Sequence, residues 1–138
     1  MVVTAGTNND PADLEPVPAN ALIERFVPQA ELLPRCSAVV HHAGAGTMFG
    51  ALAHGLPAVA IPQGADNFTL AEALRKAGVA RVLMPGTVSA GAVREAVQSV
   101  LDDPSYAVAA RRTADEIAAM PGPEEVAAVL RRRFGRVG

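Results

Sequence analysis

Residues 39 to 47 read Val39-Val40-His41-His42-Ala43-Gly44-Ala45-Gly46-Thr47. An apolar run ends in a turn of small residues, and the pattern predicts that a helix starts from this turn. The first N–H groups of a helix have no partner within it, and they point outward with the positive end of the helix dipole. A turn of this kind between a strand and a helix predicts an anion site suited to a diphosphate.

Five residues of this turn make up the predicted diphosphate site. The backbone of Gly44, Ala45 and Gly46 supplies N–H groups, and the two glycines leave room for an anion to approach. The imidazole of His42 and the hydroxyl of Thr47 each add a hydrogen-bond donor. The neighbouring His41 is interpreted as the satisfied polar end of the strand and not as a ligand.

Composition limits the partners of the chain. It has 138 residues, half of them hydrophobic, which is enough for one domain with a core of its own. A net charge of -2 and a pI near 5.9 argue against nucleic acid as a partner. The apolar runs are too short and too broken to span a membrane, and the single cysteine forms no internal disulfide. These features predict a cytoplasmic protein.

Apolar runs alternate with helical patterns through the first two thirds of the sequence. The expected strands are Val2–Ala5, Leu22–Val27, Ala38–His41, Ala58–Ile61 and Val79–Met84, and the expected helices between them are Thr47–His54 and Asn67–Ala77. This alternation predicts an α/β fold, a Rossmann-like doubly wound parallel sheet covered on both faces.

The last third is predicted to be helical, over Ala92–Leu101, then from a helix cap at Asp103-Pro104, and again after Pro121-Gly122-Pro123. The final helix is expected to be amphipathic, with apolar residues along one side: Val126, Val129, Leu130 and Phe134. The sequence is expected to form one domain over 1–138, with a βα core in 1–86 and the C-terminal helices in 87–138. Its basic end, formed by Arg131, Arg132, Arg133 and Arg136, is interpreted as a solvated helix end.

Several separated motifs occur in a diagnostic order: Phe26-Val27-Pro28-Gln29, then residues 41–47, then Gly55-Leu56-Pro57, Ile61-Pro62 and Asp66-Asn67. In this order they resemble the C-terminal, nucleotide-sugar-binding lobe of the GT-B family 1 glycosyltransferases that tailor macrolides, enediynes and other natural products. The resemblance spans nearly the whole chain.

The resemblance implies roles by position. His42 would contact the donor diphosphate, together with residues 44–47. Phe26 would stack on the base, the Val27 backbone would pair with the pyrimidine, and Gln29 would bind near the sugar of the nucleoside. Asp66 and Asn67 would bind the hydroxyl groups of the transferred hexose. The family needs no metal and no cofactor beyond the sugar donor.

One departure from the family points to the nucleotide. Many uridine-nucleotide enzymes carry a glutamate eight residues after the motif histidine, where it accepts the ribose hydroxyls, and Gly50 stands at that position here. Because a deoxyribose lacks the 2'-hydroxyl, this loss favours a TDP-sugar over a UDP-sugar.

Some of these residues have a second interpretation. Asp66 is also expected to be the N-cap of its helix, a role that can coexist with sugar binding. Phe26 is alternatively part of the core, and Pro28-Gln29 the start of a short helix. His54 is interpreted as a surface residue that complements a helix end.

The implied reaction is the inverting transfer of a hexose or deoxyhexose to a natural-product hydroxyl. The family places the catalytic base on an N-terminal acceptor lobe that this sequence does not contain, so no catalytic residue is assigned here and the chain alone is expected to be inactive. The alternatives are a non-catalytic nucleotide-binding or interaction fragment and a dinucleotide-dependent oxidoreductase domain, whose third glycine would fall at Phe49.

The resemblance begins at the second strand of the family's lobe. The first strand is central in the order 3-2-1-4-5-6, so a gap is expected between Val2–Ala5 and Ala38–His41. Either these two segments pair directly or another chain supplies the strand, because unpaired strand edges are costly. The isolated chain is therefore expected to be unstable, to self-associate or to bind an acceptor lobe.

Overall fold

The structure, a computed structural model, describes residues 1–135, and Arg136 of the basic end lies outside the described residues. All five predicted strands form, each shorter than predicted. They are β1 (Val2–Thr4), β2 (Leu22–Glu24), β3 (Val39–His41), β4 (Ala58–Ala60) and β5 (Ala80–Val82).

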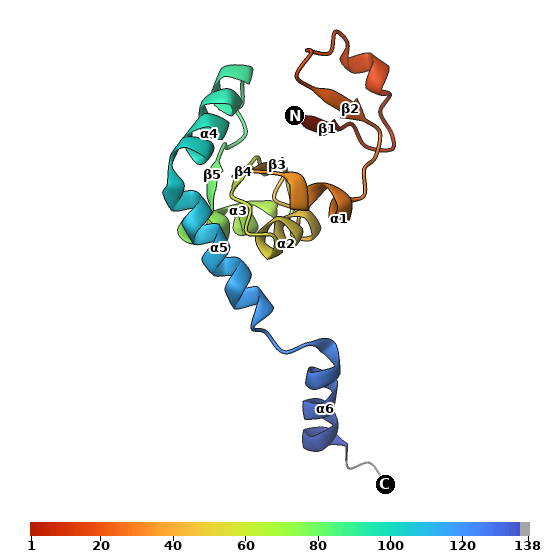
Figure 1. Cartoon of the computed structure of the whole chain (residues 1–138), viewed down its shortest axis with the longest axis vertical. Helices are drawn as coiled ribbons and strands as arrows, with labels where there is room; N and C mark the ends of the chain where they lie inside the picture. Colours follow the sequence, from red (N-terminus) through yellow and green to blue (C-terminus); the bar gives the residue numbers. More distant parts are fainter. Residues whose placement is uncertain (136–138) are drawn as a thin grey trace.

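Six α-helices and two short 3₁₀ helices complete the described chain (Figure 1). The α-helices are α1 (Gln29–Leu32), α2 (Ala45–Ala53), α3 (Asn67–Lys76), α4 (Ala90–Asp102), α5 (Pro104–Ala118) and α6 (Pro123–Phe134), and the 3₁₀ helices are η1 (Pro11–Leu14) and η2 (Leu33–Arg35). The predicted cap of α5 is confirmed, because Asp103 Oδ1 accepts the Ser105 N–H at 2.9 Å. No helix within residues 1–135 is long and apolar enough to cross a membrane.

The three-stranded sheet β3–β4–β5 is parallel, as predicted, and its central strand β4 is covered on both faces. Ala58 and Ala60 pack on one face, in a cluster with buried side chains of α2, α3 and α5. Val59 points to the opposite face and packs against Ala96 and Val100 of α4. Because β4 is buried on both sides, it is the centre of the core.

The sheet has the gap that was expected between β1 and β3. Strands β1 and β2 form a separate parallel pair, and β1 does not pair with β3, so the first of the two alternatives, direct pairing of these segments, is wrong. Strand β3 packs instead against helical residues, because Val39 contacts the cluster formed by Leu33, Ala51 and Leu56. The break lies between β1 and β3, at the position that the expected order assigns to the family's first strand.

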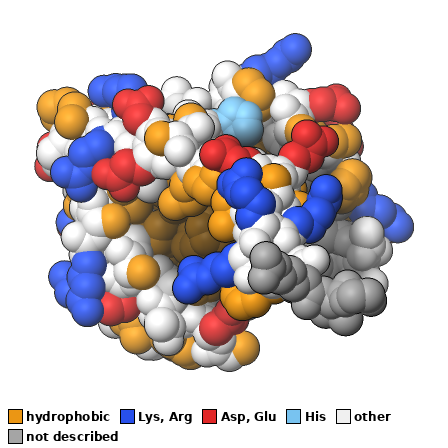
Figure 2. Space-filling model, turned by 90° about the horizontal axis from the view of Figure 1, so that it is seen from below, with side chains coloured by type: hydrophobic (Ala, Val, Ile, Leu, Met, Phe, Trp, Pro, Cys, Tyr) orange, Lys and Arg blue, Asp and Glu red, His pale blue; other side chains and the backbone are white. Residues whose placement is uncertain are grey.

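Helix α6 projects from the rest of the molecule beyond α5 (Figure 1). The apolar residues predicted for one side of this helix stay exposed: Val126, Val129, Leu130 and Phe134. Seen from below, hydrophobic side chains gather in a hollow bordered by Lys and Arg side chains (Figure 2).

Candidate functional site

The turn from β3 to α2 presents an open helix N-terminus. Gly44 occupies the N-cap position and offers no side-chain cap. The first intrahelical bond runs from the Met48 N–H to the Gly44 carbonyl at 3.0 Å, and the N–H groups of Ala45, Gly46 and Thr47 donate to no group in residues 1–135. Three adjacent backbone donors therefore remain free at the positive end of the helix dipole.

Position 44 has no room for a side chain while the His42 ring keeps its place. A Cβ atom there would collide with the imidazole ring of His42, so the exposed His42 side chain lies across the N-cap. At Gly46 an added Cβ would meet no atom within 4 Å. The two glycines thus differ. The space beside Gly44 is filled by the His42 ring, whereas the space beside Gly46 in the first turn of α2 is empty.

A hydrogen bond joins two of the predicted site residues that lie 18 positions apart. The Gln29 side-chain amide on α1 donates to Thr47 Oγ1 on α2 at 2.9 Å. The start of α1 therefore lies beside the first turn of α2. This bond occupies one lone pair of the Thr47 hydroxyl, whose proton stays available for an anion.

The segment before α1 contains Phe26, for which one of the two interpretations was a place in the core. Phe26 is 69% exposed, so the interpretation that it belongs to the core is wrong. Val27 is half-buried, and Pro28 precedes the short helix that begins at Gln29, as predicted. The aromatic ring of Phe26 is therefore exposed to solvent, three residues before α1 begins.

Asp66 stands at the predicted N-cap position, but the predicted capping by its side chain is wrong. Asp66 holds the N-cap position of α3, but its side chain accepts no capping hydrogen bond. Its backbone already has helical angles, φ -76° and ψ -8°, whereas a capping side chain needs an extended N-cap backbone. The carboxylate is exposed, and Asn67 behind it is half-buried.

The segment before α3 starts beside the turn from β3 to α2, the predicted diphosphate site. The Ile61 N–H donates to the His41 carbonyl at 2.8 Å, which joins the end of β4 to the end of β3. Since both strands run in the same direction, their carboxyl ends meet at one edge, where α/β proteins bind ligands.

The structure gives a local reason for the glycine at position 50. A Cβ atom there would lie 3.1 Å from Leu33 Cδ1 and 3.6 Å from Gln29 Oε1. Leu33 is buried and part of the packing of α2 against η2. The space into which a longer side chain at position 50 would extend is thus bordered by Leu33 and by the amide of Gln29.

The two histidines that were not assigned as ligands behave differently. His54 is exposed, and its Nδ1 contacts the Gly50 carbonyl at 2.9 Å, as expected for a residue at a helix end. His41 is buried, and burial, with a smaller contribution from the charge of His42, lowers its pKa from 6.5 to about 4. One of its ring nitrogens, Nε2, has no hydrogen-bond partner, so His41 is only half satisfied. Sequence reasoning missed this residue's contacts, and no signal in the sequence marks them.

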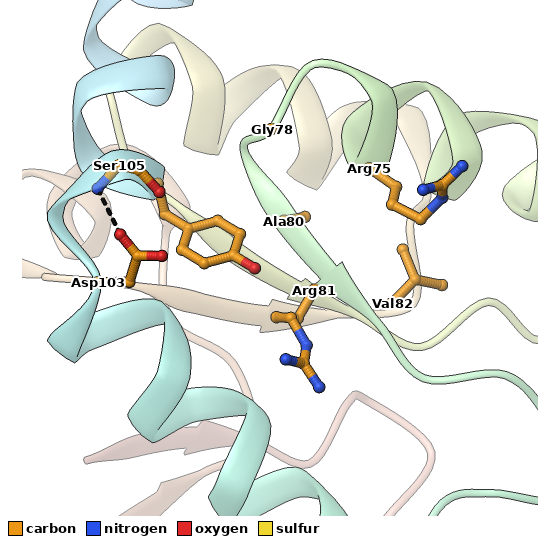
Figure 3. A pocket seen from close by; sticks show the side chains of 8 residues that line it. Arg75, Gly78, Ala80, Arg81, Val82, Asp103 and Ser105 are labelled. Atoms are coloured by element: carbon orange, nitrogen blue, oxygen red, sulfur yellow. Dashed lines mark hydrogen bonds between the residues drawn. The ribbon is translucent and has the colours of Figure 1, made fainter.

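A hollow of about 390 Å³ lies elsewhere, along β5 and the start of α5. Its lining includes Arg75, Arg81, Asp103, Ser105 and Tyr106 (Figure 3). Arg75 is paired with Glu72, and Asp103 is engaged in capping α5. None of the predicted site residues lines this hollow.

The family is identified by a match over residues 1–132 to the model of "Erythromycin biosynthesis protein CIII-like, C-terminal domain". The chain belongs to this glycosyltransferase domain family. Its relatives include elloramycin, erythronolide and oleandomycin glycosyltransferases, and membership sets aside the oxidoreductase hypothesis.

Individual relatives agree with this membership. The domain is 40% identical over 128 residues to the elloramycin glycosyltransferase ElmGT of Streptomyces olivaceus. This match covers 91% of the chain and 31% of the relative. It is 37% identical over 113 residues to the 3-alpha-mycarosylerythronolide B desosaminyl transferase of Saccharopolyspora erythraea, covering 82% of the chain and 27% of the relative.

Solved structures share the fold of the domain. The calicheamicin glycosyltransferase CalG4 superposes with a TM-score of 0.90 at 29% identity, over 99% of this chain and 36% of that one. The glycosyltransferase VinC, solved in complex with DTDP, gives a TM-score of 0.86 at 31% identity, over 91% of this chain and 32% of that one. The domain therefore spans about a third of the length of these enzymes.

Proposed function

We propose that this domain is the donor-binding lobe of an inverting, metal-independent glycosyltransferase. It would bind a TDP-sugar or UDP-sugar and take part in the transfer of a hexose or deoxyhexose to a natural-product hydroxyl. The observation that carries the proposal is the uncapped N-terminus of α2, where three free N–H groups lie beside the His42 ring.

The chemical role of this turn is stabilisation of the leaving group. As the glycosidic bond to the diphosphate breaks, negative charge grows on the departing oxygens. Hydrogen bonds from residues 45–47, from the Thr47 hydroxyl and from His42 strengthen as that charge develops, which lowers the barrier. The catalytic base would come from an acceptor lobe outside this domain.

The remaining candidate residues extend the proposed site in two directions. Phe26, Val27 and Gln29 would bind the nucleoside, and the Gln29–Thr47 hydrogen bond supports this by linking α1 to the turn. Asp66 and Asn67 would bind the sugar, and the exposed, uncommitted carboxylate of Asp66 supports that role.

We favour TDP over UDP as the nucleotide. Gly50 offers no carboxylate for ribose hydroxyls, and Leu33 borders the space where one would lie. Two structural neighbours were solved with thymidine diphosphate, VinC and the glycosyltransferase SsfS6 of Streptomyces sp. SF2575.

Calorimetric titration of the domain with TDP, UDP and NAD tests the proposal. TDP is expected to bind more tightly than UDP, and NAD not at all. His42→Ala should weaken TDP binding by about tenfold or more, because a charge-assisted contact is lost. His54→Ala is the matched control, since it removes an exposed histidine at the other end of α2 and should change nothing. Absence of TDP binding, or equal effects of the two variants, would refute the proposal.

A further inference from the structure

The side chain of His41 lies inside the protein directly beneath the diphosphate turn. It is 8% exposed, and its register with Ala60 places it on the face of the sheet that α2 covers. Its Nδ1 accepts the N–H of Ala43 at 3.0 Å. Because an amide can only donate, Nδ1 carries no proton, and the neutral ring holds its proton on Nε2.

Ala43 has an unusual backbone. Its φ angle is 67°, in the left-handed region where a Cβ atom is unfavourable, and its side chain is completely buried. The residue reverses the chain between β3 and α2, so its conformation sets the direction in which Gly44 and the start of α2 point. The Ala43 N–H, at the start of this reversal, donates to His41 Nδ1.

Two energetically costly features coincide at this turn. One is the left-handed alanine, and the other is the His41 Nε2–H, a buried donor without a partner in the described part of the chain. Strain and unsatisfied polar groups that persist together mark functional sites more often than purely structural ones. The conformation of this turn is therefore better explained by a functional role of the groups that it exposes, the His42 ring and the free N–H groups of α2, than by a contribution to stability.

We propose that His41 is a positioning residue for the diphosphate turn. Its Nδ1 holds Ala43 in the left-handed conformation, and this directs the His42 ring and the free N–H groups of α2 toward one point. His41 does not touch the nucleotide. The inference rests on the proposed diphosphate binding, and it adds that the His41–Ala43 hydrogen bond preorganises the site.

Three substitutions test the role through TDP affinity. His41→Leu keeps an apolar side chain but removes the acceptor, and we expect it to weaken TDP binding by about tenfold. His41→Asn places its Oδ1 where Nδ1 stood, so it should bind within about threefold of the unmodified domain. Adding Ala43→Gly to His41→Leu should recover most of the affinity, because glycine adopts a positive φ without support.

A merely structural role for His41 predicts a different pattern. The Leu and Asn variants would then lose affinity equally, or Ala43→Gly would rescue nothing, and either result overturns the inference. Unchanged TDP binding by His41→Leu would also overturn it.

Nitrogen-15 NMR of the unmodified domain at pH 7 reads the same hydrogen bond without ligand or mutation. We expect His41 Nδ1 to be unprotonated and Nε2 to be protonated; a protonated Nδ1 overturns the inference even if His41→Leu fails to fold. Failure of the domain to bind TDP while Nδ1 is unprotonated refutes the proposed function and leaves the His41–Ala43 contact standing. TDP binding with a protonated Nδ1 refutes the role of His41 alone.

Discussion

Side chains around the β3–α2 turn divide into those that hold its backbone and those that face solvent. His41 is buried and bonded to Ala43, whereas His42 is exposed and lies across Gly44. Two adjacent histidines thus have opposite environments, since neighbouring residues of a strand end point to opposite sides. In the proposed site, the exposed His42 would contact the ligand and the buried His41 would position the turn.

Acid is expected to destabilise the domain through His41. Its pKa is about 4 in the folded protein, below its ordinary value of 6.5. Between these values the unfolded chain binds a proton that the folded chain does not, so the stabilisation is full above pH 6.5 and is lost as the pH falls toward 4. The loss amounts to about 3 kcal/mol.

Denaturant unfolding of the domain and of His41→Asn, at intervals from pH 7 to pH 4, measures this effect. As the pH is lowered, the free energy of unfolding should decrease more steeply for the unmodified domain than for His41→Asn, because asparagine does not titrate. Equal slopes for the two proteins would contradict the assignment.

Alanine at positions 44 and 46 should have different consequences. Gly44→Ala forces the His42 ring away from the N-cap, so TDP affinity should fall by about tenfold. Gly46→Ala adds a methyl group in open space within the first turn of α2, so it should stabilise the helix by about 0.5–1 kcal/mol and reduce affinity less. Calorimetry and thermal unfolding of both variants check this, and equal TDP affinities for the two would contradict the assigned position of the His42 ring.

At the scale of elements, the contact between α1 and α2 is expected to set nucleotide preference. Gly50→Glu should raise the affinity for UDP relative to TDP, since a carboxylate can accept ribose hydroxyls once the Leu33 side chain shifts. Gly50→Gln is the matched control, with the same shape and no charge. Competition titration measures the ratio, and an unchanged ratio in Gly50→Glu would count against this account of specificity.

The two sheets should differ in local stability. The amides of β4 are expected to exchange hydrogen slowest, because β4 is buried and paired on both sides. Those of β1 and β2 should exchange much faster, because these strands pair only with each other and are largely exposed. Hydrogen exchange followed by mass spectrometry checks this, and equal protection of both sheets would show that the break between β1 and β3 is closed in solution.

The sequence predicted the elements well because apolar runs between turn residues are local signals. All five strands, the cap of α5 and the helix start at Gln29 follow from such patterns. The gap between β1 and β3 was predicted, but whether the two strands would close it by pairing directly was not, because such pairing depends on contacts between distant segments. The left-handed Ala43 was also missed, since alanine carries no sequence signal for a positive φ. Asp66 misled because capping depends on backbone angles that residue type does not fix.

At the scale of the whole molecule, two apolar regions lack a partner within residues 1–135. One is the broken edge between β1 and β3, where Val40 is 47% exposed, and the other is the apolar side of α6. The relatives are about three times longer than this domain. We propose that these regions bind further polypeptide, either an acceptor lobe or a second copy of the chain.

Self-association is therefore expected for the purified domain and is measured by sedimentation velocity over a range of concentrations. Val40→Lys should reduce it, because a charged side chain on an edge strand opposes pairing. Val108→Lys on α5 is the control, since Val108 is similarly exposed but lies away from the break. A stable monomer of the unmodified domain at every concentration would contradict the expectation.

The central claim is that the β3–α2 turn binds a nucleoside diphosphate, and mapping of backbone amide NMR shifts on addition of TDP tests it most directly. We expect the largest shifts at residues 42–47 and smaller ones at 26–29, with none at Arg81 or Ser105 in the hollow beside β5. Shifts concentrated in that hollow, or no shifts at residues 42–47, would contradict the account.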